Sequence, residues 1–399
     1  MDTPFLKGPK TPSHSEPSPT MNSFSLRKGV SQSRDPAVAA RELHAALDQP
    51  GIKLAVFYCA HDLDLERLSA ELRQRFGEIN LIGCTTAGEI TPQGYLAGTI
   101  TGFSLAGDEL DAETQIFSVH PFDTRASTKS VDDIVARLSA KGEAPVGPQN
   151  SFAFLLIDGL SMQEEMVVSC LHQQLHGIDL IGGSAADDTR FGSTKLYHGG
   201  RFHDQVALLT LVRTSLPFTT FRTQHFVHSS KRMVVTRADP AHRVVFEING
   251  KPAAREFARL VGLQVTDLSP LIFATHPVVV RIGGQYFVRS IAKVNPDESL
   301  TFFCAIDEGI VLTIATGVDM VENLREAFDN VRQEIGQPQL VIGCDCILRR
   351  LESEREGIKD EIGKIFVDNN VIGFATYGEQ FNSMHVNQTF TGIAIGAHA

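Results

Sequence analysis

The sequence predicts an α/β protein with mixed β-sheets covered by helices, because one strand–helix–strand–strand pattern occurs three times. The three copies open with apolar strands at residues 53–59, 152–158 and 338–347. An amphipathic helix, a second buried strand and a further strand follow in each copy. A crossover helix between parallel strands covers one face of their sheet, so we expect the helices on one face of each sheet.

The second strand of each copy ends in the same kind of turn. These segments read NLIGCTTAGEI from residue 80, DLIGGSAADDT from residue 179 and NVIGFATYGEQF from residue 370. The first copy aligns without a gap on the second at an offset of 99 residues and on the third at 290. Each copy thus keeps a Gly that is followed six residues later by a carboxylate: Glu89, Asp188 and Glu379.

The helix of each copy is predicted from local signals. In the first copy Leu68 and Leu72 lie on one apolar stripe. In the second copy Ser161 and Glu164 have the spacing of a capping box, which predicts the start of the helix. In the third copy residues 349–366 are predicted to form a single, longer helix.

Composition along the chain predicts the domain organisation. Residues 1–33 are rich in Pro, Ser and Thr and show no apolar period, so we predict a disordered tail. Residues 34–228 are expected to form an N-terminal domain with two copies of the unit. Residues 229–399 are expected to form a C-terminal domain with the third copy and extra strands. The boundary is predicted near residues 228–232.

Composition also excludes several classes of protein. The net charge is −11, whereas a generic nucleic-acid binder presents a basic surface. No segment approaches the roughly 18 apolar residues of a membrane span, and the N-terminus lacks the pattern of a signal peptide. The six cysteines are scattered, which favours buried thiols in a reducing compartment over a disulfide framework. We therefore predict a cytoplasmic protein.

Catalytic motifs are absent from the sequence. It contains no G-x-x-x-x-G-K-[ST] loop, no G-x-S-x-G elbow and no H-E-x-x-H helix, so we predict no catalytic residue and no enzyme. The Thr-x-Gly-Glu loops of two copies are candidates for a ligand site, since small residues let a ligand approach the backbone. The alternative is structural, because turn glycines and capping carboxylates recur in duplicated folds. The predicted ligand-binding residues are Thr86, Gly88, Glu89, Thr376, Tyr377, Gly378 and Glu379.

Two of the fourteen histidines differ from the rest in their surroundings. His276 lies between apolar residues in LSPLIFATHPVVVRI, and His385 follows the third motif in GEQFNSMHVNQTF. A haem ligand needs a histidine on the wall of a dry apolar pocket, so each is a candidate for binding haem iron. The alternative for each is a histidine that is hydrogen-bonded within the fold.

The repeated IGCTTAGE…ITGFSL, the LIGGSAADD stretch and the terminal GFATYGEQF together resemble the FIST family, a sensory module with N- and C-terminal parts. The resemblance covers nearly the whole chain beyond residue 33. It implies an intracellular sensor of a small ligand such as an amino acid. Residues 275–392 further resemble a standalone bacterial branch that binds haem and senses nitric oxide, and that regulates histidine kinases and cyclic-di-GMP signalling.

Two functional hypotheses follow from this resemblance. The first is a cytoplasmic sensor that binds haem through His276 or His385, senses nitric oxide and regulates a partner histidine kinase in a two-component system. The second is a haem-free sensor whose Thr-x-Gly-Glu loops bind an amino acid or a similar small metabolite. In both cases we expect a signalling protein as the partner. We expect neither binding to nucleic acid nor a membrane span, and the sequence does not decide whether the chain forms a homo-oligomer.

Overall fold

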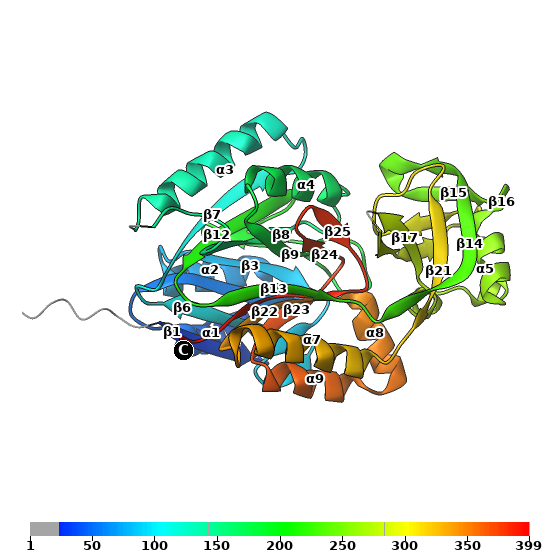
Figure 1. Cartoon of the computed structure of the whole chain (residues 1–399). Helices are drawn as coiled ribbons and strands as arrows, with labels where there is room; N and C mark the ends of the chain where they lie inside the picture. The colour runs from blue at the N-terminus through cyan, green and yellow to red at the C-terminus, as the bar shows by residue number, and fades with distance from the viewer. Residues whose placement is uncertain (1–23, 143, 283, 399) are drawn as a thin grey trace, which may run out of the picture.

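The structure is a computed structural model that describes residues 24–142, 144–282 and 284–398. Three related α/β units form one body, and a smaller β-rich domain is inserted into the third unit (Figure 1). The predicted class, mixed β-sheets with helices, is confirmed. Each unit also begins with an edge strand and a helix, which the repeat pattern did not reveal. No helix within the described ranges is long and apolar enough to cross a membrane.

The first unit contains eight elements. These are β1 (Ser25–Ser31), α1 (Pro36–Leu47), β2 (Ile52–Ala60), α2 (Leu65–Phe76), β3 (Leu81–Thr86), β4 (Glu89–Thr91), β5 (Gly94–Leu96) and β6 (Ile100–Ala106). At the start of α2 the Asp64 carboxylate accepts a hydrogen bond from the Arg67 amide, and Leu68 and Leu72 are buried as their spacing predicts.

β1 falls within the segment that was predicted to be a disordered tail. Residues 25–31 pair antiparallel with β6 along their whole length. A neighbouring strand distant in the sequence supplies these hydrogen bonds, so local composition gives no sign of them. Residues 1–23 of the predicted tail lie outside the described part of the chain.

The second unit repeats this order. It comprises β7 (Leu110–Ser118), α3 (Thr124–Ser139), β8 (Ser151–Ile157), α4 (Glu164–Gln174), β9 (Asp179–Ser184), β10 (Leu196–His198), β11 (Arg201–His203) and β12 (Val206–Thr214). The predicted capping box at the start of α4 is wrong: the N-cap residue is Gln163, and no side chain caps the helix. Glu164 forms an ion pair with Arg243 of the inserted domain instead.

The third unit starts before the inserted domain and resumes after it. It comprises β13 (Phe218–Thr223), α7 (Met320–Ile335), β22 (Leu340–Cys346), α8 (Ile347–Glu356), α9 (Lys359–Asp368), β23 (Val371–Thr376), β24 (Glu379–Phe381), β25 (Met384–Val386) and β26 (Phe390–Ile395). The single helix predicted over residues 349–366 is wrong. It breaks into α8 and α9 because Gly357 ends α8 in the left-handed conformation, at φ 70°.

The units are joined by exchange of their hairpins. Each unit forms a sheet from its edge strand, last strand, first core strand and second core strand, and a hairpin from another unit completes the sheet. The three orders are β1-β6-β2-β3-β10-β11, β7-β12-β8-β9-β24-β25 and β13-β26-β22-β23-β4-β5. Because the first unit lends its hairpin to the third, the third to the second and the second to the first, the exchange closes a ring.

The hydrophobic core has one central layer, which the three sheets share, and three outer layers, each between one sheet and its helices. One face of each sheet is covered by its own helices: α1 and α2, then α3 and α4, then α7, α8 and α9. The prediction of helices on one face is therefore confirmed. The opposite faces meet in a central core, where the ring of Tyr58 from the first unit stacks 4.6 Å from that of Phe374 from the third. All six cysteines are free thiols, and all but Cys170 are buried, as predicted.

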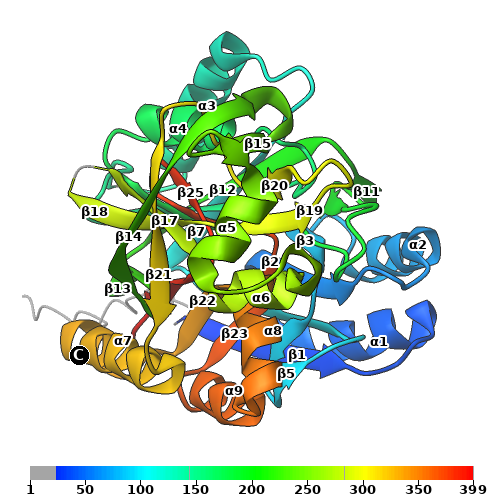
Figure 2. The ribbon, with the colours of Figure 1, turned by 90° about the vertical axis from the view of Figure 1, so that its right-hand side faces the viewer.

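The inserted domain lies between β13 and α7 and faces the viewer in Figure 2. Its strands are β14 (Phe226–Asp239), β15 (Val244–Ile248), β16 (Lys251–Pro252), β17 (Val278–Ile282), β18 (Gln285–Arg289), β19 (Ile291–Val294), β20 (Leu300–Phe302) and β21 (Val311–Gly317), with helices α5 (Ala253–Val261) and α6 (Pro270–Thr275). The strands form one sheet, and the sheet and the two helices enclose a small core of their own. The predicted boundary at residues 228–232 lies inside β14.

Candidate functional site

The ends of the three second strands meet in a closed set of backbone hydrogen bonds. The Ala87 amide donates to the Ala375 carbonyl at 3.0 Å, and the Ala186 amide donates to the Thr85 carbonyl at 3.0 Å. The set is closed by the bond from the Tyr377 amide to the Ser184 carbonyl, at 3.4 Å. Within these three bonds each unit donates to one neighbour and accepts from the other, and the bonds from the Ala375 amide to the Gly88 carbonyl and from the Ser184 amide to the Gly378 carbonyl add to the contact. The small residues of the motif let neighbouring units approach each other's backbone here.

The repeated glycine of the motif is also required by a close approach between two stretches of backbone. A Cβ atom at Gly83 would lie 2.6 Å from the Phe57 carbonyl oxygen of the adjacent parallel strand. Gly182 and Gly373 occupy the same place in their own sheets, where a Cβ atom would also collide with backbone of the neighbouring strand. Backbone cannot move aside as a flexible side chain can, so only glycine fits these three positions.

The first Thr-x-Gly-Glu loop is buried and internally satisfied. Glu89 is 0% exposed, and its carboxylate accepts hydrogen bonds from the Thr86 hydroxyl at 2.5 Å, the Thr99 hydroxyl at 2.7 Å and the Thr99 amide at 3.0 Å. Burial raises the pKa of Glu89, and these donors oppose the effect. Gly88 has φ 135° and lies under the Arg350 guanidinium. The carboxylate ties β4 to the start of β6.

The loop of the third unit has the same arrangement. The Glu379 carboxylate accepts from the Thr376 hydroxyl at 2.7 Å and from the Thr389 hydroxyl and amide at 2.7 and 3.2 Å. Burial raises the pKa of Glu379 to about 8. In both loops the structure assigns the threonine and the glutamate a structural role, and their predicted contact with a ligand stays a prediction.

The middle unit departs from the predicted alignment after its second strand. The offset of 99 residues places Glu89 on Asp188, but the equivalent hairpin strand, β10, begins at Leu196, eight residues later. The gapless alignment is therefore wrong beyond β9, because the second unit carries a longer loop. This loop wraps the Tyr377 hydroxyl, which donates to the Asp188 carbonyl at 2.7 Å and to the Asp187 carboxylate.

Aromatic side chains join this loop to the inserted domain. The ring of Phe191 stacks 4.7 Å from Tyr377 and lies 5.5 Å from Phe303, which follows β20. Phe191 is 40% exposed and has φ 50°, a conformation that is strained for a bulky residue. Tyr377 is thus the one predicted ligand-binding residue that also faces the inserted domain.

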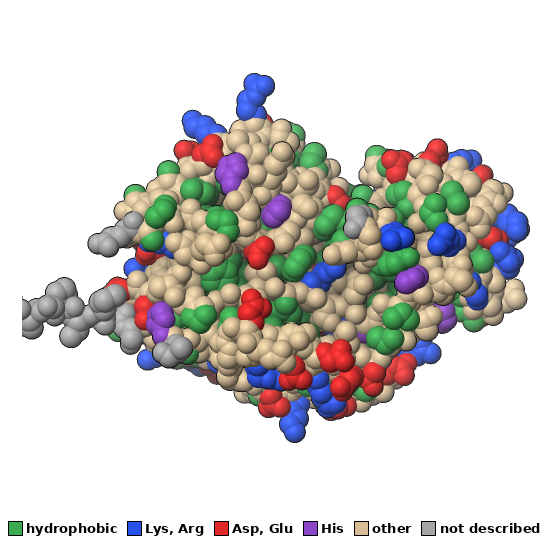
Figure 3. Space-filling model, viewed as in Figure 1, with side chains coloured by type: hydrophobic (Ala, Val, Ile, Leu, Met, Phe, Trp, Pro, Cys, Tyr) green, Lys and Arg blue, Asp and Glu red, His purple; other side chains and the backbone are tan. Residues whose placement is uncertain are grey.

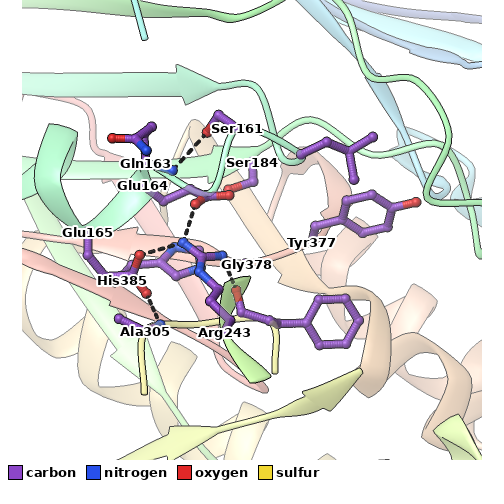
Figure 4. Close-up of polar contacts among 12 residues, drawn as sticks. Ser161, Gln163, Glu164, Glu165, Ser184, Arg243, Ala305, Tyr377, Gly378 and His385 are labelled. Carbon is purple, nitrogen blue, oxygen red and sulfur yellow. Dashed lines mark hydrogen bonds and ion pairs between the residues drawn. The ribbon is translucent and has the colours of Figure 1, made fainter. Parts of the chain in front are cut away.

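An arginine of the inserted domain forms the polar centre of the domain junction. Arg243 is 5% exposed, and its guanidinium lies between the carboxylates of Glu164 and Glu165 at 2.5 and 2.6 Å (Figure 4). It also donates to the Phe303 carbonyl at 2.6 Å. The second carboxylate in turn accepts a hydrogen bond from the Ala305 amide. Figure 3 shows a surface notch between the two lobes.

Burial and the neighbouring charges shift the pKa values of the two carboxyl groups at this centre. Burial raises the pKa of Glu164 to about 7, against the opposing effect of the Arg243 charge. Burial also acts to raise the pKa of Glu165, but His385 and Arg243 lower it overall. The sequence offered no sign of this cluster, because Glu164 had the spacing of a capping residue and Arg243 lies in a turn almost eighty residues away.

His385 is the predicted histidine that reaches this cluster. It is 2% exposed on β25, and burial lowers its pKa to about 4, so the imidazole is neutral at pH 7. Gln380 Nε2 lies 3.3 Å from His385 Nδ1, which makes Nδ1 the acceptor and leaves the proton on Nε2. Nε2 makes no hydrogen bond within the described residues, although the Phe303 backbone lies close enough to the ring to act on its pKa. A Cβ atom at Gly378 would lie 2.7 Å from Nε2.

Several buried polar atoms without a partner belong to the segment that contains His385. Within residues 380–388, four side chains that are at most 2% exposed each keep one such atom. These atoms are Gln380 Oε1, His385 Nε2, Asn387 Oδ1 and Gln388 Oε1. A buried polar group that lacks a partner costs about 1–3 kcal/mol. Four in nine residues therefore indicate missing partners, such as a polar ligand or water.

His276 lies elsewhere and is bound within the fold. It follows α6, where its Nδ1 lies 3.0 Å from the Thr275 hydroxyl and 3.3 Å from the Ile272 carbonyl. Neither His276 nor His385 lines any of five well-formed surface pockets among the described residues. The described residues also contain no group of three or more His, Cys, Asp or Glu side chains that fits a metal ion.

The residues around the two histidines do not fit a haem group. Such a group needs an apolar wall, whereas His385 is surrounded by the charges of Glu165, Arg243 and Arg289. The Gly378 backbone packs beside the His385 ring, where an added Cβ atom would collide with Nε2. The neutral state of the His385 imidazole is the one feature here that an iron ligand shares.

Comparison with known proteins gives the family. The model of the FIST N domain matches residues 53–251, and that of the FIST C domain matches residues 253–382. No curated protein matches the chain. Because the two matches together span most of the sequence in the expected order, the chain belongs to the FIST family of sensory domains.

Proposed function

We propose that this chain is a small-ligand sensor in signalling, and that the ligand binds in the seam between the third unit and the inserted domain. The observation that carries the proposal is the group of unpartnered polar atoms in the segment that contains His385. A ligand with hydrogen-bond donors and acceptors supplies partners for these atoms, as an amino acid or a similar metabolite does.

The position of this seam suits a sensor. Its walls come from α4 of the second unit, β24–β25 of the third and the inserted domain, so a ligand there contacts three parts of the chain. A ligand that binds one arrangement of these parts more tightly shifts the population toward it. A signalling partner, such as a histidine kinase, then responds to the changed surface.

The experiment is a thermal-shift screen of amino acids and related metabolites on the full chain. We expect at least one compound to raise the unfolding temperature with a saturable dose response, and His385→Ala to lose that response. His172→Ala, a substitution on α4 outside the seam, is the matched control and keeps it. The proposal fails if no compound stabilises the protein, or if both variants respond alike.

A haem-bound sensor of nitric oxide is the second proposal. The neutral imidazole of His385 favours it, while the charges around that ring and the proton on its Nε2 oppose it. The test is an absorption spectrum after expression with a haem precursor. A colourless protein that takes up no added haemin removes this proposal and leaves the first.

A further inference from the structure

The seam contains a second buried arginine, and this one has no counter-ion. Arg289 ends β18 and is 7% exposed. Its only hydrogen bond goes to the His385 carbonyl, at 3.4 Å. Among the described residues no carboxylate lies within 4.0 Å of its guanidinium, whereas the equally buried Arg213 pairs with Asp111 at 2.7 Å. The other guanidinium nitrogens of Arg289 are not among the fully buried atoms without a partner, so they reach solvent at the seam, where an anion can pair with them.

The neighbouring groups do not supply this anion. Glu164 and Glu165 are both occupied by Arg243. The Cys304 thiol is close enough for the charge of Arg289 to lower the thiol's pKa. Burial nevertheless raises this pKa to about 11, so the thiol is neutral at pH 7. The fully buried Ser290, next in the chain, has a hydroxyl without a partner. Arg289 thus has no direct ion-pair partner among the described residues, and its guanidinium is available to a molecule from outside.

From this geometry we infer a subsite for a singly charged carboxylate, in which Arg289 pairs with the ligand's anionic group. The planar fork of a guanidinium matches a carboxylate in a bidentate arrangement. The Nε2 proton of His385 supplies a further donor on the same seam. The acidic pair of α4 disfavours a doubly charged group such as phosphate, because like charges repel at short range.

This subsite deepens the proposed function and rests on it. It identifies the charged end of the ligand, whereas the unpartnered atoms of residues 380–388 would receive its polar remainder. Access is available along α4 and the loop of the second unit. There the side chain of Glu165 is 27% exposed, and Met162, Met166 and Phe191 are at least 40% exposed.

The test measures the unfolding temperature of the full chain in a zwitterionic buffer with sodium acetate, sodium phosphate or sodium chloride at matched ionic strength. We expect acetate to raise the unfolding temperature of the wild-type chain in a saturable way, and more than the other two salts. Arg289→Gln should lose this difference. Arg213→Gln, which removes an equally buried arginine far from the seam, should keep it.

A second variant keeps the inference testable if Arg289→Gln does not fold. Arg289→Lys retains the charge but loses the fork, so we expect at least a tenfold weaker response to acetate. Equal effects of the three salts on the wild-type chain, or an unchanged acetate response in either Arg289 variant, overturn the subsite. If acetate does not stabilise the chain but a metabolite does, only the carboxylate subsite is refuted. If acetate stabilises the chain through Arg289 but no metabolite does, the sensor proposal is refuted instead.

Discussion

Replacing Glu89 by alanine tests whether the carboxylate of the repeated motif holds the units together. In the structure this side chain is 0% exposed and accepts three hydrogen bonds, one from Thr86 and two from Thr99. Its removal leaves the Thr99 hydroxyl and amide buried without an acceptor, at about 1–3 kcal/mol each, and leaves the Thr86 hydroxyl with only the Cys59 carbonyl at 3.4 Å. Relaxation and water entry recover part of this cost. We therefore expect the free energy of unfolding to fall by about 3–5 kcal/mol.

The assay is equilibrium unfolding in urea, followed by circular dichroism. The unfolding midpoint should fall while the slope with denaturant stays constant, since the native fold is the same. Glu71→Ala is the control, because that glutamate forms only an i,i+4 pair with Arg75 on α2, which is worth about 0–1 kcal/mol. A loss below about 1 kcal/mol for Glu89→Ala would refute the structural assignment and favour the predicted ligand role.

Three further predictions concern the domain junction and the third loop. Arg243→Met leaves Glu164 and Glu165 without their counter-ion, so we expect a loss of about 3–5 kcal/mol in urea unfolding and faster proteolysis of the links at residues 224–225 and 318–319. Gly378→Ala brings a methyl group against His385 and should lower the unfolding temperature, whereas adding His385→Ala should restore part of it; no recovery would mean that the two do not touch. Burial raises the pKa of Glu379 from 4.5 to about 8, so the folded chain keeps a proton that the unfolded chain loses between these values. The contribution of Glu379 to stability therefore falls as pH rises through this window, and Glu379→Gln should flatten the dependence of unfolding on pH.

The repeated pattern predicted most of the body of the molecule. Strand and helix periods at three places identified mixed sheets with helices on one face, because that pattern follows from which side chains must be buried. The sequence-based resemblance to FIST domains agrees with both family models. The edge strands β1 and β13 were missed, since each is held by pairing with a strand far away in the chain. The longer loop of the second unit was missed because Asp188 happened to match the offset.

The candidate site was predictable only in part. Tyr377, Gly378 and His385 were singled out from the third motif, and they do meet at the seam. Their partners were not found, because Glu164 read as a helix cap and Arg243 and Arg289 occur in otherwise ordinary strand and turn segments. An ion pair between residues almost eighty positions apart leaves no local pattern, since it depends on how the two domains are placed.

By itself, then, the sequence determined the repeat, the fold class and the buried faces, because local periodicity sets these features. Only the tertiary structure decided that the units exchange hairpins in a closed ring, and that Glu89 and Glu379 are satisfied within their own loops. It also decided that Arg243 has two carboxylates while Arg289 has none. The physical reason is that burial and pairing of charge depend on which distant segments are brought together, and no single segment carries that information.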